Sequence, residues 1–300
     1  MVVFCDPVGS GGLVGADFAE VVAGLVGQDY ESLQYLFFLV GPDDEVRQAY
    51  ESHIAQHLPL AAVRKVEGNP GYGPTQNAAA RLVDGDNGLF LFLHDDVCLA
   101  SNAVSELVTE LSRSNAAVVG PKLVQWDDPT LLQHVGMGVD RCGEIDPIVL
   151  PGEKDQQQHD AVADVFCLPS ACLLVRSDLF RTLGGFHPGI TFGGEEMDLC
   201  WRVHLTGGRV VVVPSAVARH RENFTSRQPL IGLTTMSETH RVATVLSCTS
   251  SARLLPVFFQ MLGLSLLELP VAIATGKWKQ GIAALRATCG GVLQFGSIAK

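Results

Sequence analysis

The hydrophobic residues of the N-terminal half form two alternating patterns. Short unbroken apolar runs, typical of strands buried on both faces of a parallel sheet, occupy residues 2–5, 36–40 and 89–93, and residues 62–66 predict another short strand. Apolar residues at helical spacing lie between them and predict helices over residues 18–26, 46–58 and 74–82. Strands that alternate with helices in this way predict an α/β fold, with a Rossmann-like, mostly parallel central sheet and helices on both faces.

The second half continues the alternation less regularly. We expect a helix over 101–112, a strand over 116–120, strand-like segments at 165–168 and 171–175, and a helix that starts near Glu195. A last buried strand covers 209–213 and is ended by Pro214. The segment 121–160 is poor in periodicity, and a loop-rich excursion of that length is often functional.

The run at 89–93 stops abruptly at His94-Asp95-Asp96. Open α/β sheets bind their ligands at the carboxyl ends of central strands, and a buried acidic pair there favours a divalent cation. The alternative is a turn whose Asp side chains face solvent and cap the helix beginning near Ser101.

A second cluster of acids follows Gly193-Gly194. Glu195, Glu196 and Asp198 occupy the first turn of the predicted helix, where the helix dipole favours ionised carboxylates, and one of them would serve as a general base. The alternative is a well-capped helix in which Asp198 pairs with Arg202 at i+4.

Two further segments carry polar candidates. The glycine-rich loop 68–73 precedes a helix, and Asn69 and Asn77 have amides that can donate to a ligand, although a tight loop of no chemical role fits as well. His220 follows the last strand, where a neutral imidazole is either a metal ligand or an ordinary surface or core residue.

Charge divides the chain into two parts. Residues 1–228 hold 15 Lys and Arg against 30 Asp and Glu, whereas residues 229–300 hold six against two. The acidic first part argues against nucleic acid as a partner, and the basic, apolar second part suits an anionic membrane surface. We therefore expect two domains, 1–228 and a helical, membrane-associated extension at 229–300.

The segment 254–275 is long enough to cross a bilayer, but Pro256, Gln260, Glu268 and Pro270 argue against a clean span. With Lys277, Trp278 and Lys279 as an interfacial anchor, it favours helices that lie on a membrane or dock to a membrane-embedded partner. The alternative is a helical extension packed on the first domain. The N-terminus has no signal-peptide pattern and the eight cysteines form no CxxC pair, so we expect a cytoplasmic protein, peripheral at the inner face of the cell membrane.

Four separated segments together carry a family resemblance: the loop 68–73 with Asn77, the strand ending in His94-Asp95-Asp96, the segment GGFHPGITFGGEEMDLCWR, and RVVVVPSAVARH. Their order over residues 1–222 resembles the family-two glycosyltransferases of the GT-A fold, in particular bacterial members that build cell-envelope polysaccharides. In that family an inverting enzyme moves a sugar from a nucleotide-sugar donor to a glycan or lipid-linked acceptor.

The resemblance implies a role for each candidate. Asp96 and His220 would hold Mg²⁺ or Mn²⁺, and Glu196 would be the catalytic base, with Glu195 and Asp198 beside it. The residues implied in nucleotide-sugar binding are Asp6, Asn69, Gly71, Asn77, His94 and Asp95.

Three positions depart from the family pattern. The first strand ends in Cys5-Asp6-Pro7, Gly41 stands where a base-binding Asp is usual, with Asp43 and Asp44 nearby, and Glu196 replaces an Asp. These departures leave two alternatives: a catalytically silent, glycosyltransferase-like scaffold of a membrane polysaccharide assembly, or a nucleotidyltransferase, against which the GGF segment speaks.

Overall fold

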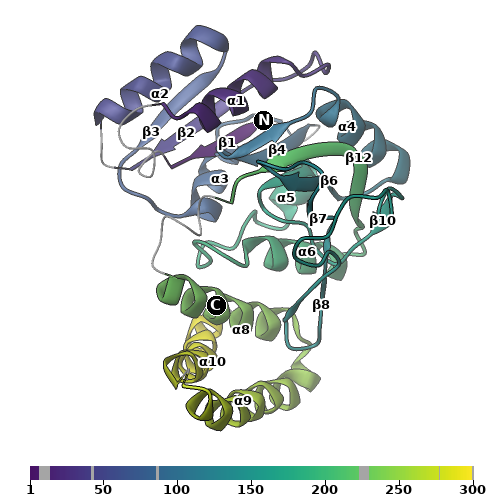
Figure 1. Cartoon of the computed structure of the whole chain (residues 1–300). Helices are drawn as coiled ribbons and strands as arrows, with labels where there is room; N and C mark the ends of the chain where they lie inside the picture. Colours follow the sequence, from purple (N-terminus) through teal and green to yellow (C-terminus); the bar gives the residue numbers. More distant parts are fainter. Residues whose placement is uncertain (7–13, 42–43, 86–87, 223–229, 277, 299–300) are drawn as a thin grey trace.

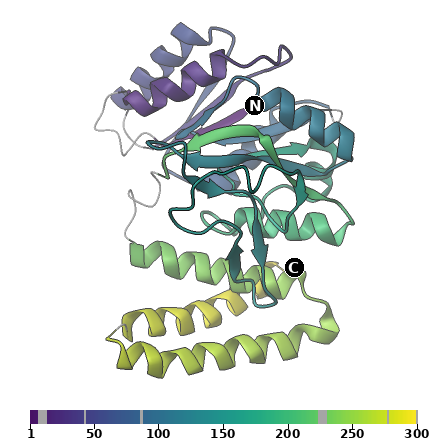
Figure 2. The same cartoon turned by 45° about the vertical axis from the view of Figure 1, so that its right-hand side comes forward.

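The chain forms an α/β layer structure followed by a separate layer of three helices (Figures 1 and 2). This computed structural model describes residues 1–6, 14–41, 44–85, 88–222, 230–276 and 278–298. The predicted boundary between residues 228 and 229 lies outside the described residues.

The central sheet is mostly parallel, as predicted. Six of its strands run in the same direction: β3 (Ala62–Val66), β2 (Leu36–Val40), β1 (Val2–Cys5), β4 (Leu89–His94), β6 (Val118–Gln125) and β12 (Val210–His220). Strand β11 (Cys172–Arg176) lies antiparallel between β4 and β6, and β10 (Ala163–Asp164) pairs with β12 at the edge. The carboxyl ends of β1, β4 and β12 therefore meet on one side of the sheet, which is where the acidic motif lies.

Helices cover both faces of this sheet, which confirms the predicted fold class. Buried residues of α1 (Ala16–Val26), α2 (Asp44–His57) and α4 (Ala103–Ser114) share one apolar core with the strands. The core on the other face takes residues from α3 (Tyr72–Arg81), α5 (Ser177–Thr182) and α6 (Glu195–Leu205). Side chains of the central strands alternate between the two cores, so these strands are buried on both sides, whereas the edge strands β3 and β10 are largely exposed.

Strand β12 and the segment 165–168 differ from the predicted elements. Strand β12 does not end at Pro214 but continues to His220, with its pairing to β6 shifted between Val213 and Val217. A proline, which lacks the backbone N–H, is tolerated at such an irregularity. Residues 165–168 are not a strand; Cys167 forms only an isolated bridge to Met137.

The loop-rich segment 121–160 contains short strands of its own. Strand β6 extends into it, β7 (Leu132–His134) pairs with β6, and β8 (Met137–Val139) forms a hairpin with β9 (Ile145–Pro147). Between β4 and α4 lies β5 (Val97–Leu99), which pairs with β12. The hairpin extends from the sheet toward the C-terminal helices (Figures 1 and 2).

The three C-terminal helices are α8 (Leu230–Cys248), α9 (Ser251–Ala274) and α10 (Trp278–Ile298). Helix α8 packs on the α/β part: Cys142 of the hairpin shares a small apolar core with Val242, Val245 and Leu246. Helix α9 is long and apolar enough to cross a membrane by length and composition, yet its most apolar window is only 11% buried.

Candidate functional site

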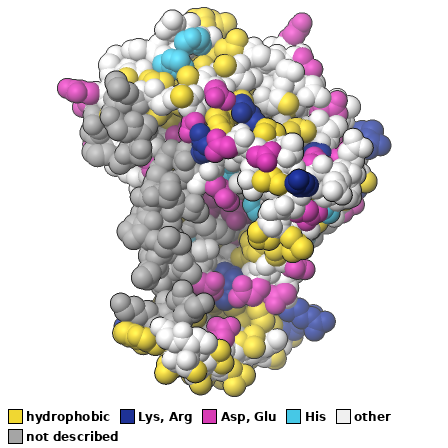
Figure 3. Space-filling view, viewed as in Figure 1, with side chains coloured by type: hydrophobic (Ala, Val, Ile, Leu, Met, Phe, Trp, Pro, Cys, Tyr) yellow, Lys and Arg dark blue, Asp and Glu magenta, His cyan; other side chains and the backbone are white. Residues whose placement is uncertain are grey.

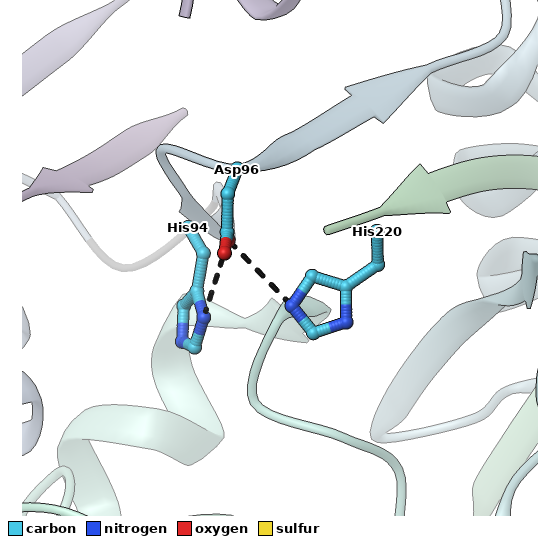
Figure 4. A group of neighbouring side chains, drawn as sticks. All are labelled: His94, Asp96 and His220. Carbon is cyan, nitrogen blue, oxygen red and sulfur yellow. Dashed lines mark ion pairs between the residues drawn. The ribbon is translucent and has the colours of Figure 1, made fainter. Parts of the chain in front are cut away.

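Three potential metal ligands converge at the carboxyl ends of β4 and β12. His94 ends β4, Asp96 lies in the turn after it, and His220 ends β12 (Figure 4). Nε2 of His220 lies 3.5 Å and Nδ1 of His94 lies 4.0 Å from Oδ1 of Asp96. One ligand atom from each residue falls within 4.8 Å of the other two, a spacing that fits one shared cation.

The orientation of His220 also suits a metal ligand. Its Nδ1 donates a hydrogen bond to Oε1 of Gln133 at 3.0 Å, because an amide oxygen can only accept. The lone pair of the neutral ring is therefore on Nε2, the atom that faces Asp96. A lone pair directed at a carboxylate is repelled unless a proton or a metal ion lies between them, and these residues fit a divalent metal.

Both acids of the motif are buried, with Asp95 8% and Asp96 4% exposed. Helix α4 starts at Ala103; its N-cap residue Asn102 makes no side-chain hydrogen bond, and the backbone N–H of Val104 donates to Oε1 of Gln28. The alternative of a solvent-facing, helix-capping turn is therefore wrong.

A second group of residues, those predicted to bind the nucleotide-sugar, surrounds Asp95. The backbone N–H of Asp6 donates to Oδ2 of Asp95 at 3.0 Å, and Nδ2 of Asn69 donates to Oδ2 of Asp6 at 2.8 Å. Oδ1 of Asn69 in turn accepts from the backbone N–H of Gly71 at 3.1 Å. The ends of β1 and β4 and the glycine-rich loop are thus tied into one polar edge.

Gly71 has a geometric reason to be glycine. Its φ is 104°, and a Cβ built on it would lie 2.6 Å from the carbonyl oxygen of Thr191. The N–H of Tyr72 donates to that same oxygen at 2.8 Å. The glycine-rich loop therefore lies against the segment that leads to the second cluster of acids.

A chain of buried contacts joins that cluster to the metal ligands. Oγ of Ser170 donates to Oε1 of Glu195 at 2.9 Å, and the hydroxyl of Tyr72 donates to the carbonyl of Ser170 at 2.8 Å. The Tyr72 ring meets the His94 ring edge to face, with centroids 4.7 Å apart. Glu195 and His94, which are distant in the sequence, are separated here by two residues.

The adjacent carboxylates of α6 have unusual acidity. Burial first, and the charge of neighbouring Glu196 second, raise the pKa of Glu195 to about 8. Burial also raises the pKa of Glu196, whose side chain is half-buried. One acid of such a pair stays neutral while the other ionises, an arrangement typical of acid and base groups in active sites.

Two predicted site residues face elsewhere. Asp198 is buried and forms an ion pair with Arg202, whose Nε lies 2.9 Å from Oδ2 of Asp198. The side-chain amide of Asn77 donates to the carbonyl of Phe186 and accepts from its N–H, at 2.7 and 2.8 Å. Both side chains hold the polypeptide around the site, and neither amide nor carboxylate is directed at the His94–Asp96–His220 cluster.

Near the Gly41 departure, Asp44 is paired with Arg47 and its side chain is largely exposed. Asp43 lies outside the described residues. Trp201 of α6 meets Phe166 edge to face, with ring centroids 5.2 Å apart.

Residues without a recognisable sequence signal complete the site. His240 of α8 is 5% exposed, and its Nδ1 lies 3.1 and 3.0 Å from the carbonyl oxygens of Phe192 and Gly193. It therefore holds the loop that precedes Glu195. Gln133 and Ser170 act in the same indirect way, and only the low periodicity of 121–160 pointed toward Gln133. Tyr72 also acts indirectly, but it lies in the glycine-rich loop 68–73 that the sequence had singled out.

Comparisons with known proteins agree with this architecture. Over 170 residues the chain is 28% identical to the O-antigen biosynthesis protein RfbC of Myxococcus xanthus, covering 53% of this chain and 13% of that protein. Over 132 residues it is 30% identical to the pre-mycofactocin glycosyltransferase of Mycobacterium tuberculosis, covering 43% of this chain and 26% of that protein. The chain thus spans only a small part of the length of these relatives.

Solved structures show the same fold at low identity. GalNAc-T7, crystallised with UDP, GalNAc and Mn²⁺, superposes with a TM-score of 0.59 at 14% identity, over 82% of this chain and 49% of that one. The mannosyltransferase PcManGT of Pyrobaculum calidifontis, in complex with GDP-Man and Mn²⁺, gives 0.54 at 14% identity, over 98% and 86%.

The sequence profile described as "Glycosyl transferase family 2" matches residues 15–184, which include the acidic motif. Because the match covers more than half of the chain, this protein belongs to glycosyl transferase family 2, as the resemblance of its motifs predicted.

Proposed function

We propose that the protein is a metal-dependent, inverting glycosyltransferase that moves a sugar from a nucleotide-sugar donor to a glycan or lipid-linked acceptor. The observation that carries the proposal is the series of contacts from Glu195 through Ser170 and Tyr72 to His94. It places acids of two remote segments at one edge of the sheet, where open α/β folds bind ligands. Synthesis of an envelope polysaccharide is the setting that the named role of RfbC supports.

In this proposal Asp96, His220 and His94 hold the metal. The sequence resemblance assigned His94 to nucleotide-sugar binding, but the short distance between His94 and Asp96 makes His94 a third candidate metal ligand. Two imidazoles favour Mn²⁺ over Mg²⁺, since Mg²⁺ prefers oxygen ligands and retained water. When bound, the metal supplies Lewis-acid stabilisation of the charge that develops on the departing nucleoside diphosphate.

Glu196 is the proposed base, and it takes the proton of the acceptor hydroxyl as that oxygen attacks the anomeric carbon. Glu195 remains neutral at neutral pH because its pKa is about 8, so it adds no second negative charge beside Glu196. Asp6, Asn69 and Asp95 form the polar edge on which the donor lies. Gly71, Asn77 and Asp198 are assigned to positioning.

Three variants test these assignments. Glu196→Gln keeps the shape of the side chain but cannot accept a proton, so we expect transfer to fall by at least about a hundredfold while Mn²⁺ affinity is retained. Asp96→Asn should lose both Mn²⁺ affinity and transfer. Asp178→Asn removes an exposed acid that pairs with Arg176 away from the site and serves as the control.

Calorimetric titration of nucleoside diphosphates, with and without Mn²⁺, together with a transfer assay on nucleotide-sugars, measures the outcome. Wild-type turnover in both Glu196→Gln and Asp96→Asn would reject the mechanism. Nucleotide binding without any transfer in the wild type would favour the silent scaffold instead.

We further propose that the protein works on the cytoplasmic side of the cell membrane, with α9 against the bilayer or a membrane protein. Seven large hydrophobic side chains of this helix are more than 40% exposed: Leu255, Phe259, Leu264, Leu266, Leu267, Val271 and Ile273. Exposed apolar area on this scale is uncommon on a monomeric soluble surface and typical of an interaction face.

A further inference from the structure

A cavity of about 490 Å³ lies where the turn between α8 and α9 meets α6 and the β8–β9 hairpin. Trp201 of α6, Arg141 of the hairpin and Arg253 of α9 contribute to its wall, together with Ser250 and Val257. No acidic residue lines it. It is separate from the His94–Asp96–His220 cluster, and none of its residues belongs to the proposed catalytic site.

Both arginines of the cavity are available to a ligand. Neither Arg141 nor Arg253 forms an ion pair with any described residue, whereas nearby Arg241 is paired with Glu144 and Glu238. Two arginines that line one cavity, with no acid in its wall, fit a phosphate group. The N-terminus of the 24-residue helix α9, where Ser250 is the N-cap, adds a favourable dipole.

The surface that leads away from the cavity is apolar. From Arg253, residues at helical spacing along the same face of α9 are Val257, Gln260, Leu264, Leu267 and Val271. Leu264 is 44%, Leu267 70% and Val271 63% exposed. Figure 3 shows hydrophobic side chains over the lower end of the molecule, with both Lys or Arg and Asp or Glu side chains next to them.

A cationic cavity that continues into an exposed apolar stripe matches an amphiphile in both charge and shape. We propose that this cavity binds the phosphate group of a lipid, with Arg141 and Arg253 on the phosphate and the hydrocarbon chain along α9. The site goes beyond the transfer reaction and does not depend on it. Two sources share this chemistry: a phospholipid of the bilayer and a prenyl phosphate.

Calorimetry with the full chain and farnesyl phosphate tests the proposal directly. Arg141→Gln and Arg253→Gln should each weaken binding about fivefold, the effect of one basic residue at an anionic lipid surface. Arg286→Gln is the matched control, because Arg286 is an exposed arginine of α10 outside the cavity. Farnesol and inorganic phosphate, which each carry half of the ligand, should bind at least about tenfold more weakly than farnesyl phosphate.

Flotation with phosphatidylcholine vesicles, alone or with phosphatidylglycerol or farnesyl phosphate, identifies the source. Arginine-dependent binding to either added lipid supports the site and names its ligand class. The proposed site is overturned if the wild type and the Arg141→Gln, Arg253→Gln and Arg286→Gln variants bind equally. It is also overturned if inorganic phosphate binds as tightly as farnesyl phosphate. Because no donor is present, failure here leaves the transfer mechanism standing, and unchanged melting temperatures establish that the variants are folded.

Discussion

Gln133 decides which nitrogen of His220 faces Asp96. Its Oε1 accepts from Nδ1, so Nε2 presents a lone pair to the metal ligands. We predict that Gln133→Leu lowers Mn²⁺ affinity about 10- to 100-fold, the usual cost of losing such a partner. Gln133→Glu keeps an acceptor at the same place and should retain most of the affinity.

Isothermal titration with Mn²⁺ measures both variants, and melting curves without metal show whether they fold. If Gln133→Leu binds Mn²⁺ as the wild type does, His220 needs no orienting partner. If Gln133→Glu loses as much affinity as Gln133→Leu, the hydrogen bond is not the cause.

Glu195 makes stability depend on pH. Burial first, and the charge of Glu196 second, raise its pKa to about 8, whereas an ordinary glutamate has a pKa of 4.5. The unfolded chain therefore releases this proton at a lower pH than the folded chain does. The stabilisation by neutral Glu195 is complete below about pH 4.5 and is lost as pH rises toward about 8, by an amount on the order of several kcal/mol.

Glu195→Gln removes this titration while Ser170 keeps an oxygen to donate to. We predict that the stability of the wild type relative to Glu195→Gln decreases between about pH 5 and about pH 9. Urea unfolding at both pH values measures the difference. Glu31→Gln, which removes an exposed acid, should run parallel to the wild type. A constant difference between wild type and Glu195→Gln would contradict the raised pKa.

At the scale of elements, α8 holds the loop before the proposed base. His240 contacts the carbonyls of Phe192 and Gly193, and Met236 lies 3.7 Å from the hydroxyl of Thr191. We predict that His240→Ala lowers the catalytic constant about tenfold, because the lost hydrogen bonds, worth roughly 1 to 3 kcal/mol, leave the loop less fixed.

His240→Asn offers a donor in the place of Nδ1 and should restore part of the rate. Ser247→Ala is the control on the same helix, since the Ser247 hydroxyl bonds only within α8 and to Cys248. Rate constants and donor KM are measured together. Equal loss in His240→Ala and His240→Asn would mean that the imidazole acts by packing alone.

The elements that could be predicted from sequence are those with an unbroken apolar signal. β1, β2 and β3 begin and end where the sequence predicted; β1 and β2 are buried apolar runs bounded by polar or turn residues, whereas β3 is a short, mostly exposed strand. β12 was predicted too short because Pro214 normally ends a strand, and a bulge depends on pairing with β6, which no local pattern reports. Residues 165–168 are apolar because they are largely buried, and they form only an isolated bridge, between Cys167 and Met137.

The same limit applies to the site. Asp96 and His220 carry motifs, and the structure brings them together. Gln133, Ser170 and His240 act through contacts to residues 87, 25 and 47 positions away, so no spacing in the sequence marks them. The sequence left two interpretations of Asp198, an acid of the catalytic cluster or the i+4 partner of Arg202, and the structure shows the pairing with Arg202.

At the scale of the whole molecule, charge and exposed apolar surface are concentrated in different parts. Residues 1–228 carry twice as many acids as bases, while residues 229–300 are basic and include the largely exposed helix α9. An acidic body is repelled by an anionic membrane, so such a surface would orient the protein with its C-terminal helices toward the bilayer. Lys277, part of the predicted anchor, lies outside the described residues, as does the side chain of Lys279; Trp278 is 51% exposed.

Leu267 offers the most direct test of this orientation, because its side chain is 70% exposed on α9 and its removal disturbs no core. Inserting a leucine into the membrane interface is worth roughly 1.5 kcal/mol or more, and a carboxylate there is repelled by anionic lipid. We predict that Leu267→Glu reduces flotation with phosphatidylglycerol-containing vesicles at least about tenfold. Leu60→Glu places the same charge at a 97% exposed position in the α/β part and should float like the wild type. If both variants float equally, α9 does not contact lipid, and a protein partner would be the remaining occupant of its apolar face.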